Sequence, residues 1–176
     1  MKNQFFKYME VFIFTILGVI SRLAPHAPNL TAVGALSLFV GAKYGVKRGL
    51  VVLFATMLIA DSIKGLHSVM WATYGALVIG VFIGRYISSK QNAGLIIGGT
   101  VVSSLVFFIM TNFAVWLAPN FMYAKTFQGL MQCFAMGIPF FRNTLVGDLM
   151  YAGIFFGGFE LVRSLKEKFA MRQIEK

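Results

Sequence analysis

Residues 93–117 of the chain read AGLIIGGTVVSSLVFFIMTNFAVWL, a run without a single charged side chain. About 20 apolar residues in a helix cross the roughly 30 Å hydrocarbon core of a bilayer. Backbone polar groups in lipid must be bonded within their own segment, so this run predicts a membrane-spanning helix. Two further long, mainly apolar runs, Phe5 to Leu23 and Val69 to Tyr86, precede it, and Thr144 to Val162 follows an expected turn at Pro139 to Asn143.

The composition of the chain also requires lipid as its solvent. Of the 176 residues, 58% are hydrophobic and only 12% are charged, which is too little polar surface to cover a soluble globule. The formal net charge is +10, but the basic residues lie in short breaks between apolar runs and form no stripe with interleaved aromatics. We therefore expect membrane lipid around the protein and no nucleic-acid partner.

Two shorter apolar runs, Leu30 to Ala42 and Gly49 to Ala60, lie between the first and second long runs. Each is shorter than a full span, so they are either two thin helices or a re-entrant pair. A further short run, Gln128 to Ile138, contains Gly129 and Gly137 and ends at Pro139. We expect that this last run does not cross the membrane.

The distribution of Lys and Arg decides the topology, because these residues collect in cytoplasmic loops. If both short runs cross, six helices place twelve of the sixteen Lys and Arg residues inside, among them Lys90 and Lys176, whereas a seventh span would put the cationic tail outside. No small-residue cleavage site follows the first run, so we expect it to be retained. The sequence thus predicts an all-α membrane protein with six transmembrane helices, both ends in the cytoplasm, and one domain over residues 1–176. Four cations remain for the outer side: Arg22, Lys64, Lys125 and Arg142.

In this topology many polar side chains gather at the outer ends of the spans. An ionisable group inside a span costs roughly 2.5 to 3.5 kcal/mol on insertion scales, so such groups are expected to face protein or a water-filled cavity. We expect a polar pocket that opens outward and binds a small solute. The alternative is that Arg22 or Arg142 pairs with Asp61 or Asp148 and only locks helices together. The candidate substrate-binding residues are Arg22, His26, Asn29, Thr31, Asp61, Asn112, Arg142, Asn143 and Asp148.

The ends of the expected helices indicate the charge of the solute. Asn29 resembles a cap that opens the second helix, and Asn143 with Thr144 resembles a cap that opens the sixth. Helix N-termini carry partial positive charge and unpaired N–H groups, so they favour a carboxylate or a phosphate. The alternative is that these residues are caps and nothing more. Asp148 lies four residues after Thr144, so both could line one site.

We expect no metal site, no cofactor and no catalytic residue. His26 and His67 lie in separate loops without the spacing of a metal site, and Cys133 is the single cysteine. Neither a phosphate-binding loop nor His-Glu-x-x-His occurs. Gly147-Asp148 resembles the Gly-Asp pair of intramembrane aspartyl proteases, with Asp61 as a partner, but Leu145 stands where that motif has a glycine.

Small residues recur in the second and third expected spans. They permit close approach of helices, and this region therefore forms either the internal core or a docking face for another membrane subunit. The residues are Ala32, Gly34, Ala35, Gly41, Ala42, Gly45, Gly49, Ala55 and Ala60.

Three segments resemble a family of small, uncharacterised bacterial membrane proteins: Arg22 to Thr31, Thr111 to Trp116 and Gly137 to Asp148. The likeness covers nearly the whole chain. It implies a multi-pass protein of the bacterial inner membrane.

More distantly, the layout resembles the substrate-binding S components of energy-coupling-factor vitamin transporters. Residues Gly41 to Gly49, followed by an apolar run that ends in Ala60-Asp61, are similar to the second and third helices of those proteins. The resemblance implies capture of a vitamin-like micronutrient outside, with a transmembrane coupling subunit and ATPases docking on the first three helices. The first helix departs from it, because it offers Thr15, Gly18 and Ser21 in place of an Ala-x-x-x-Ala motif.

The competing interpretation is a non-catalytic scaffold of a cell-envelope complex. In that case the outer polar groups hold helices together and no ligand exists.

Overall fold

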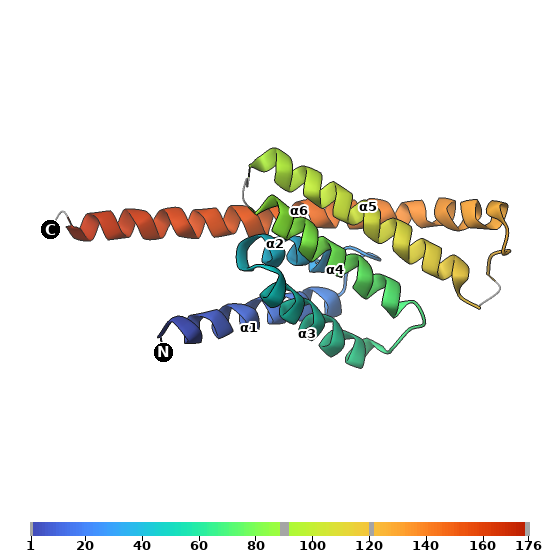
Figure 1. Cartoon of the computed structure of the whole chain (residues 1–176), viewed down its shortest axis with the longest axis horizontal. Coiled ribbons are helices and arrows are strands. Elements are labelled where there is room, and N and C mark those ends of the chain that lie inside the picture. Colours follow the sequence, from blue (N-terminus) through green and yellow to red (C-terminus); the bar gives the residue numbers. More distant parts are fainter. Residues whose placement is uncertain (1, 89–91, 120–121, 175–176) are drawn as a thin grey trace.

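The structure, a computed structural model, describes residues 2–88, 92–119 and 122–174, with side chains from 9–88, 92–119, 122–169 and 171. Lys90 and Lys176 lie outside the described residues. Described residues form helices and loops without strands (Figure 1). The helices are α1 (Lys2–Leu23), α2 (Val33–Tyr44), α3 (Val46–Lys64), α4 (Met70–Ile87), α5 (Ala93–Leu117) and α6 (Phe127–Ile174).

Three of these helices are long and apolar enough to cross a membrane within the described residues: α4, α5, and α6 from Phe127 to Phe169. The beginning of α1 and the end of α6 point to the same end of the bundle, and α6 projects well beyond the other helices there (Figure 1). The exposed surface of each long helix is rich in large apolar side chains, such as Phe12 on α1 and Phe82 on α4. Buried positions include many hydroxyl groups and two carboxylates. This distribution suits a protein surrounded by lipid.

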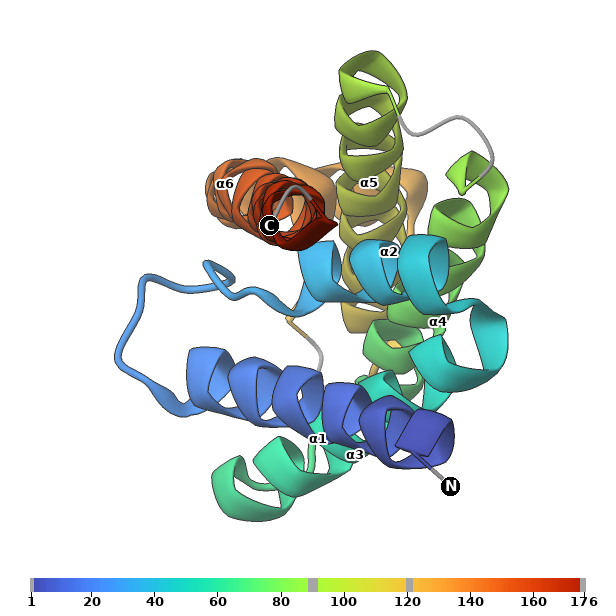
Figure 2. The ribbon, with the colours of Figure 1, turned by 90° about the vertical axis from the view of Figure 1, so that its left-hand side faces the viewer.

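The short helix α2 lies in the middle of the bundle and contacts each of the other five helices (Figure 2). Its 12 residues correspond to about 18 Å, which is less than the roughly 30 Å of a bilayer core. Most of its side chains are buried, including Phe39, around which Phe14, Phe155 and Phe156 pack. The N-terminus of α2 therefore lies inside the protein rather than at its surface.

Glycines allow α2 and α4 to pack backbone against backbone. A Cβ atom on Gly41 would overlap the carbonyl oxygen of Val81, and one on Gly84 would overlap that of Leu38. A Cβ atom on Gly34 would likewise overlap the carboxylate of Asp148. The neighbouring Ala35 is 1% exposed. The small residues of the second helix thus pack internally.

The boundaries of α1, α4 and α5 agree with the apolar runs of the sequence to within three residues, whereas α3, at 19 residues, extends beyond the run Gly49 to Ala60 at both ends. Two predictions about helix starts were wrong. The sixth helix begins at Phe127 and continues through Pro139, so no turn lies at Pro139 to Asn143 and Asn143 does not cap it. The second helix begins at Val33, after Ala32, without a side-chain cap. Asn29 instead occupies a turn with a φ of 64°.

Candidate functional site

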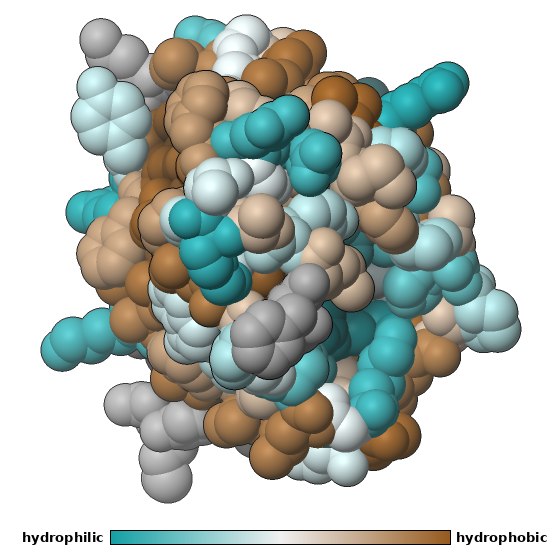
Figure 3. Space-filling view, turned by 90° about the vertical axis from the view of Figure 1, so that its right-hand side faces the viewer, coloured by the Kyte–Doolittle hydropathy of each residue, from teal (hydrophilic) through white to brown (hydrophobic). Residues whose placement is uncertain are grey.

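A cavity of about 300 Å³ lies in front of the N-terminus of α2. Its walls come from the α1–α2 loop and from all six helices. On the end face opposite the termini, hydrophilic side chains surround a hollow (Figure 3). Of the predicted site residues, five line this cavity: Arg22, His26, Asn29, Thr31 and Asp148.

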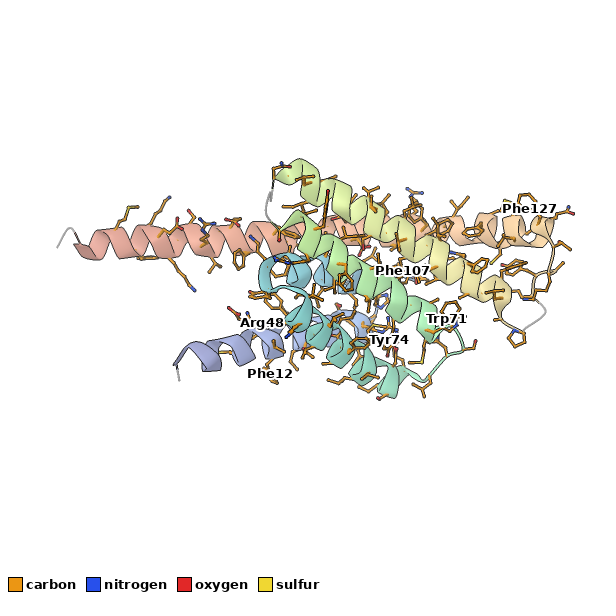
Figure 4. The ribbon with its side chains drawn as sticks, viewed as in Figure 1. Phe12, Arg48, Trp71, Tyr74, Phe107 and Phe127 are labelled. Atoms are coloured by element: carbon orange, nitrogen blue, oxygen red, sulfur yellow. The ribbon has the colours of Figure 1, made fainter. Side chains whose placement is uncertain are left out.

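Arg22, at the end of α1, forms an ion pair on one side of the cavity. Its Nη2 and Nε atoms donate to Oδ1 of Asp61 over 2.6 and 3.1 Å. Asp61 is 1% exposed, and its other oxygen accepts a 3.0 Å hydrogen bond from the hydroxyl of Tyr74, which points from α4 toward α3 (Figure 4). Of the pairings considered from the sequence, Arg22 with Asp61 is the one the structure contains, and it ties α1 to α3 and α4.

His26 and Lys64 meet at the carbonyl group of Arg22, in the last turn of α1. The Lys64 ammonium donates to the carbonyl oxygen of Arg22 over 3.1 Å, and Nε2 of His26 lies 3.3 Å from the same oxygen. Cations near a helix C-terminus interact favourably with its partial negative charge. Both side chains also line the cavity, so the outer part of its wall carries three basic residues.

The inner part of the cavity is built around Asp148 of α6, which is 4% exposed. Its carboxylate accepts 3.0 Å from the backbone N–H of Ala35 and 2.7 Å from the hydroxyl of Ser104 on α5. Ala35 lies in the first turn of α2, so Asp148 supplies from another helix the cap that α2 lacks locally. Gly34 makes this possible, because a side chain there would occupy the place of the carboxylate.

A second cavity of about 390 Å³ adjoins the first and extends toward the end of α5 and the beginning of α6. Arg22, Asn29 and Phe107 line both cavities. Asn112 lines the second cavity alone, where its amide donates 2.8 Å to the carbonyl oxygen of Phe108. Phe107, which projects from α5 at mid-height of the bundle (Figure 4), lies between the two spaces.

Three predicted site residues do not line either cavity. Asp61 contacts the first cavity only through Arg22. Arg142 is exposed and lines a separate surface depression with Leu30 and Pro139. Asn143 lines the same depression, and its amide donates 3.0 Å to the carbonyl oxygen of Pro28, which anchors the α1–α2 loop to α6.

Sequence reasoning missed several residues of the first cavity. Lys64 and Ser103 line it, and Ser104 holds Asp148. Thr144, which was expected to share one site with Asp148, also lines it. The adjacent serines in the apolar run at 93–117 were a usable signal, since polar groups in a span tend to face protein. Lys64 gave a weaker signal, because it also fits an ordinary helix end.

The described residues contain no group of three or more His, Cys, Asp or Glu side chains that could hold a metal ion. The arrangement offers instead a small cavity with hydrogen-bonding groups and both signs of charge.

Comparison with known proteins places the chain in a family without an assigned activity. A family of unknown function (DUF6580) matches residues 2–171. The chain belongs to this family. No curated protein and no solved structure was found to be similar to it.

Proposed function

We propose that this DUF6580 protein is a multi-pass protein of the bacterial inner membrane that binds a small micronutrient from the outer side and takes part in its uptake. Six helices would cross or enter the membrane, with both ends in the cytoplasm. In binding a solute from the outer side for uptake, the protein would work like the S components of energy-coupling-factor transporters. The solute would be vitamin-like in size and anionic or amphoteric.

The first cavity is the observation that supports this proposal. Its volume of about 300 Å³ is at the lower end of the range for small-molecule sites. Polar groups converge on it from several helices, and Val33, Leu77 and Phe107 supply apolar wall between them. A cavity of this composition at the N-terminus of a half-length helix is the arrangement by which many transporters hold solutes near the middle of the membrane.

A coupling subunit and its ATPases would dock on the outer faces of the first three helices. Gly34 and Ala35 face the interior and are unsuitable for docking. Exposed apolar side chains of α1 and α3, such as Ile16 and Leu58, are accessible to another membrane helix. Docking there would leave the cavity free.

A scaffold role in a cell-envelope complex is the second candidate function. It is favoured by the Arg22–Asp61–Tyr74 network, in which ionisable groups satisfy one another across three helices. Such a network needs no ligand to explain it. The cavity beside it has no role in this alternative.

Thermal denaturation of the purified protein in the presence of a panel of vitamins and their precursors separates the two functions. A ligand present at about 100 times its Kd adds about 2.7 kcal/mol to stability, so a member of the panel should raise Tm. Thr31→Trp, which places a large ring at the cavity wall, should abolish the shift. Leu66→Trp, in an exposed loop that lines neither cavity, should retain it. A shift that survives Thr31→Trp, or no shift with any compound, would favour the scaffold.

A further inference from the structure

We infer that the solute of the first cavity is a zwitterion, with an ammonium group beside Asp148 at the inner end and a carboxylate or phosphate beside Arg22, His26 and Lys64 at the outer end. This inference rests on the proposed function and narrows the class of solute. It follows from the separation of the two signs of charge along the cavity.

Asp148 provides a buried carboxylate without a cation beside it. Among the described side chains, no Lys, Arg or His lies within ion-pair distance of its oxygens. It accepts two hydrogen bonds, from Ala35 and Ser104, while a carboxylate has about four acceptor positions. Buried charges in proteins are normally paired, and an ammonium group in the cavity would complete this site.

The same carboxylate excludes an acid group from the inner end. The N-terminus of α2 would otherwise attract an anion, but Asp148 already occupies its first turn through the N–H of Ala35. A second negative charge there would meet repulsion in a site with little water. The partial positive charge of the helix therefore holds Asp148 in place and is not available for the solute.

The outer end has the opposite character. Arg22 directs Nε and Nη2 to Asp61, and within the described residues its Nη1 atom has no acceptor. Lys64 is exposed and uses one of its three donors on the carbonyl oxygen of Arg22. With one carboxylate, Asp61, against two permanent cations, this end retains positive charge for an acid group.

The depth of Asp148 makes the two ends distinct. It lies beside the first turn of α2, where Ala35 and Ser104, in the middle of α5, hold its carboxylate. Arg22 and Lys64 lie at or next to the outer ends of α1 and α3. Leu77 and Phe107 contribute apolar wall, which suits a short apolar body between the charged groups.

Equilibrium binding to the purified full-length protein at pH 7 tests the inference with matched probes. One set is 4-(aminomethyl)benzoate, 4-methylbenzoate and 4-methylbenzylamine; the second is 6-aminohexanoate, hexanoate and hexylamine. In at least one set we expect the zwitterion to bind ten-fold or more tightly than both singly charged analogues. This comparison uses the unaltered protein and does not depend on the folding of any variant.

Two substitutions then test which charged group of the solute lies at which end of the cavity. Asp148→Asn keeps acceptor and donor atoms for Ala35 and Ser104 and should remove the advantage of the zwitterion over the acid. Lys64→Gln should reduce the advantage in affinity of the zwitterion over the amine. Glu160→Gln, which affects a pair with Lys43 far from the cavity, should change neither ratio.

The possible results separate this inference from the proposed function. If the acid alone binds as tightly as the zwitterion, the inference is overturned while binding of an anionic solute stands. If no probe of either set binds, the inference is also overturned, and the proposed function is then judged by the vitamin panel. Preference for the zwitterion that persists in Asp148→Asn would contradict the assigned orientation.

Discussion

Gly34 and Asp148 lie in contact where α2 meets α6, and their fit decides whether the inner end of the cavity can form. A Cβ atom at position 34 would overlap the carboxylate. We expect Gly34→Ala to displace Asp148 from Ala35 and to lower the free energy of unfolding by about 1–3 kcal/mol, the usual range for overpacking. Chemical denaturation in detergent measures the change.

Gly153→Ala is the matched control for this substitution. Gly153 is also in a helix, but a Cβ atom there would meet nothing within 4 Å. Because Ala has the better helix propensity by up to about 1 kcal/mol, we expect equal or slightly higher stability. Equal losses in both variants would show that the contact with Asp148 is unimportant.

The second prediction at the scale of single residues concerns the stability that the Arg22–Asp61 ion pair contributes. Asp61 is buried and Arg22 is 18% exposed, and removal of Asp61 leaves an uncompensated charge on Arg22 that costs less than the about 3 kcal/mol of a fully buried pair, because water reaches it. We expect Asp61→Asn to destabilise the protein more than the double variant Arg22→Met, Asp61→Asn. A double-mutant cycle on unfolding free energies measures the coupling, and additive effects would exclude a significant pair.

Residue by residue, the sequence indicated that polar groups gather at the ends of the helices but could not pair them. The choice of Asp61 for Arg22 depends on how α1 lies against α3, which no local pattern specifies. The role of Asp148 depends on the short length of α2, because only a helix that starts inside the bundle brings its first turn to α6. Arg142 was placed at the site for its position in the chain, but its helical face turns outward.

Among the elements, the long apolar runs predicted α1, α4 and α5 closely, since lipid permits only fully hydrogen-bonded helices. The start of α6 was missed because Pro139, with Gly137 beside it, is a signal for a break in soluble proteins. Here Phe134 and Phe141 pack against Phe108 of α5 on both sides of the proline. The helix therefore contacts α5 on both sides of a position that lacks one backbone donor, and it continues through that position.

Pro139→Ala tests the continuity of α6. In a helix interior, Ala is more favourable than Pro by up to about 3 kcal/mol, so we expect the substitution to raise Tm. Pro25→Ala, in the loop between α1 and α2, restores no helical hydrogen bond and should give no comparable gain. A fall in Tm with Pro139→Ala would indicate that the chain turns at this position.

For the whole molecule, the arrangement of the ends and of the cavity bears on the topology. The beginning of α1 and the end of α6 lie at one end of the bundle (Figure 1), and the hollow lies at the other (Figure 3). The topology predicted from the sequence assigns four cations, Arg22, Lys64, Lys125 and Arg142, to the side of the hollow and the other twelve of the sixteen to the side of the chain ends. Since Lys and Arg accumulate in the cytoplasm, this asymmetry favours cytoplasmic ends and a cavity open to the outside.

Reporter fusions measure this orientation directly. An enzyme that is active only outside the cytoplasm should be inactive after Lys176 and active when inserted at Leu66, in the exposed loop between α3 and α4. α6, at 48 residues, is about 72 Å long and exceeds the bilayer, so its last turns should also be open to proteolysis from the cytoplasmic side alone. Activity of the fusion at Lys176 would reverse the orientation, place the cavity toward the cytoplasm and turn the proposed direction of uptake into export.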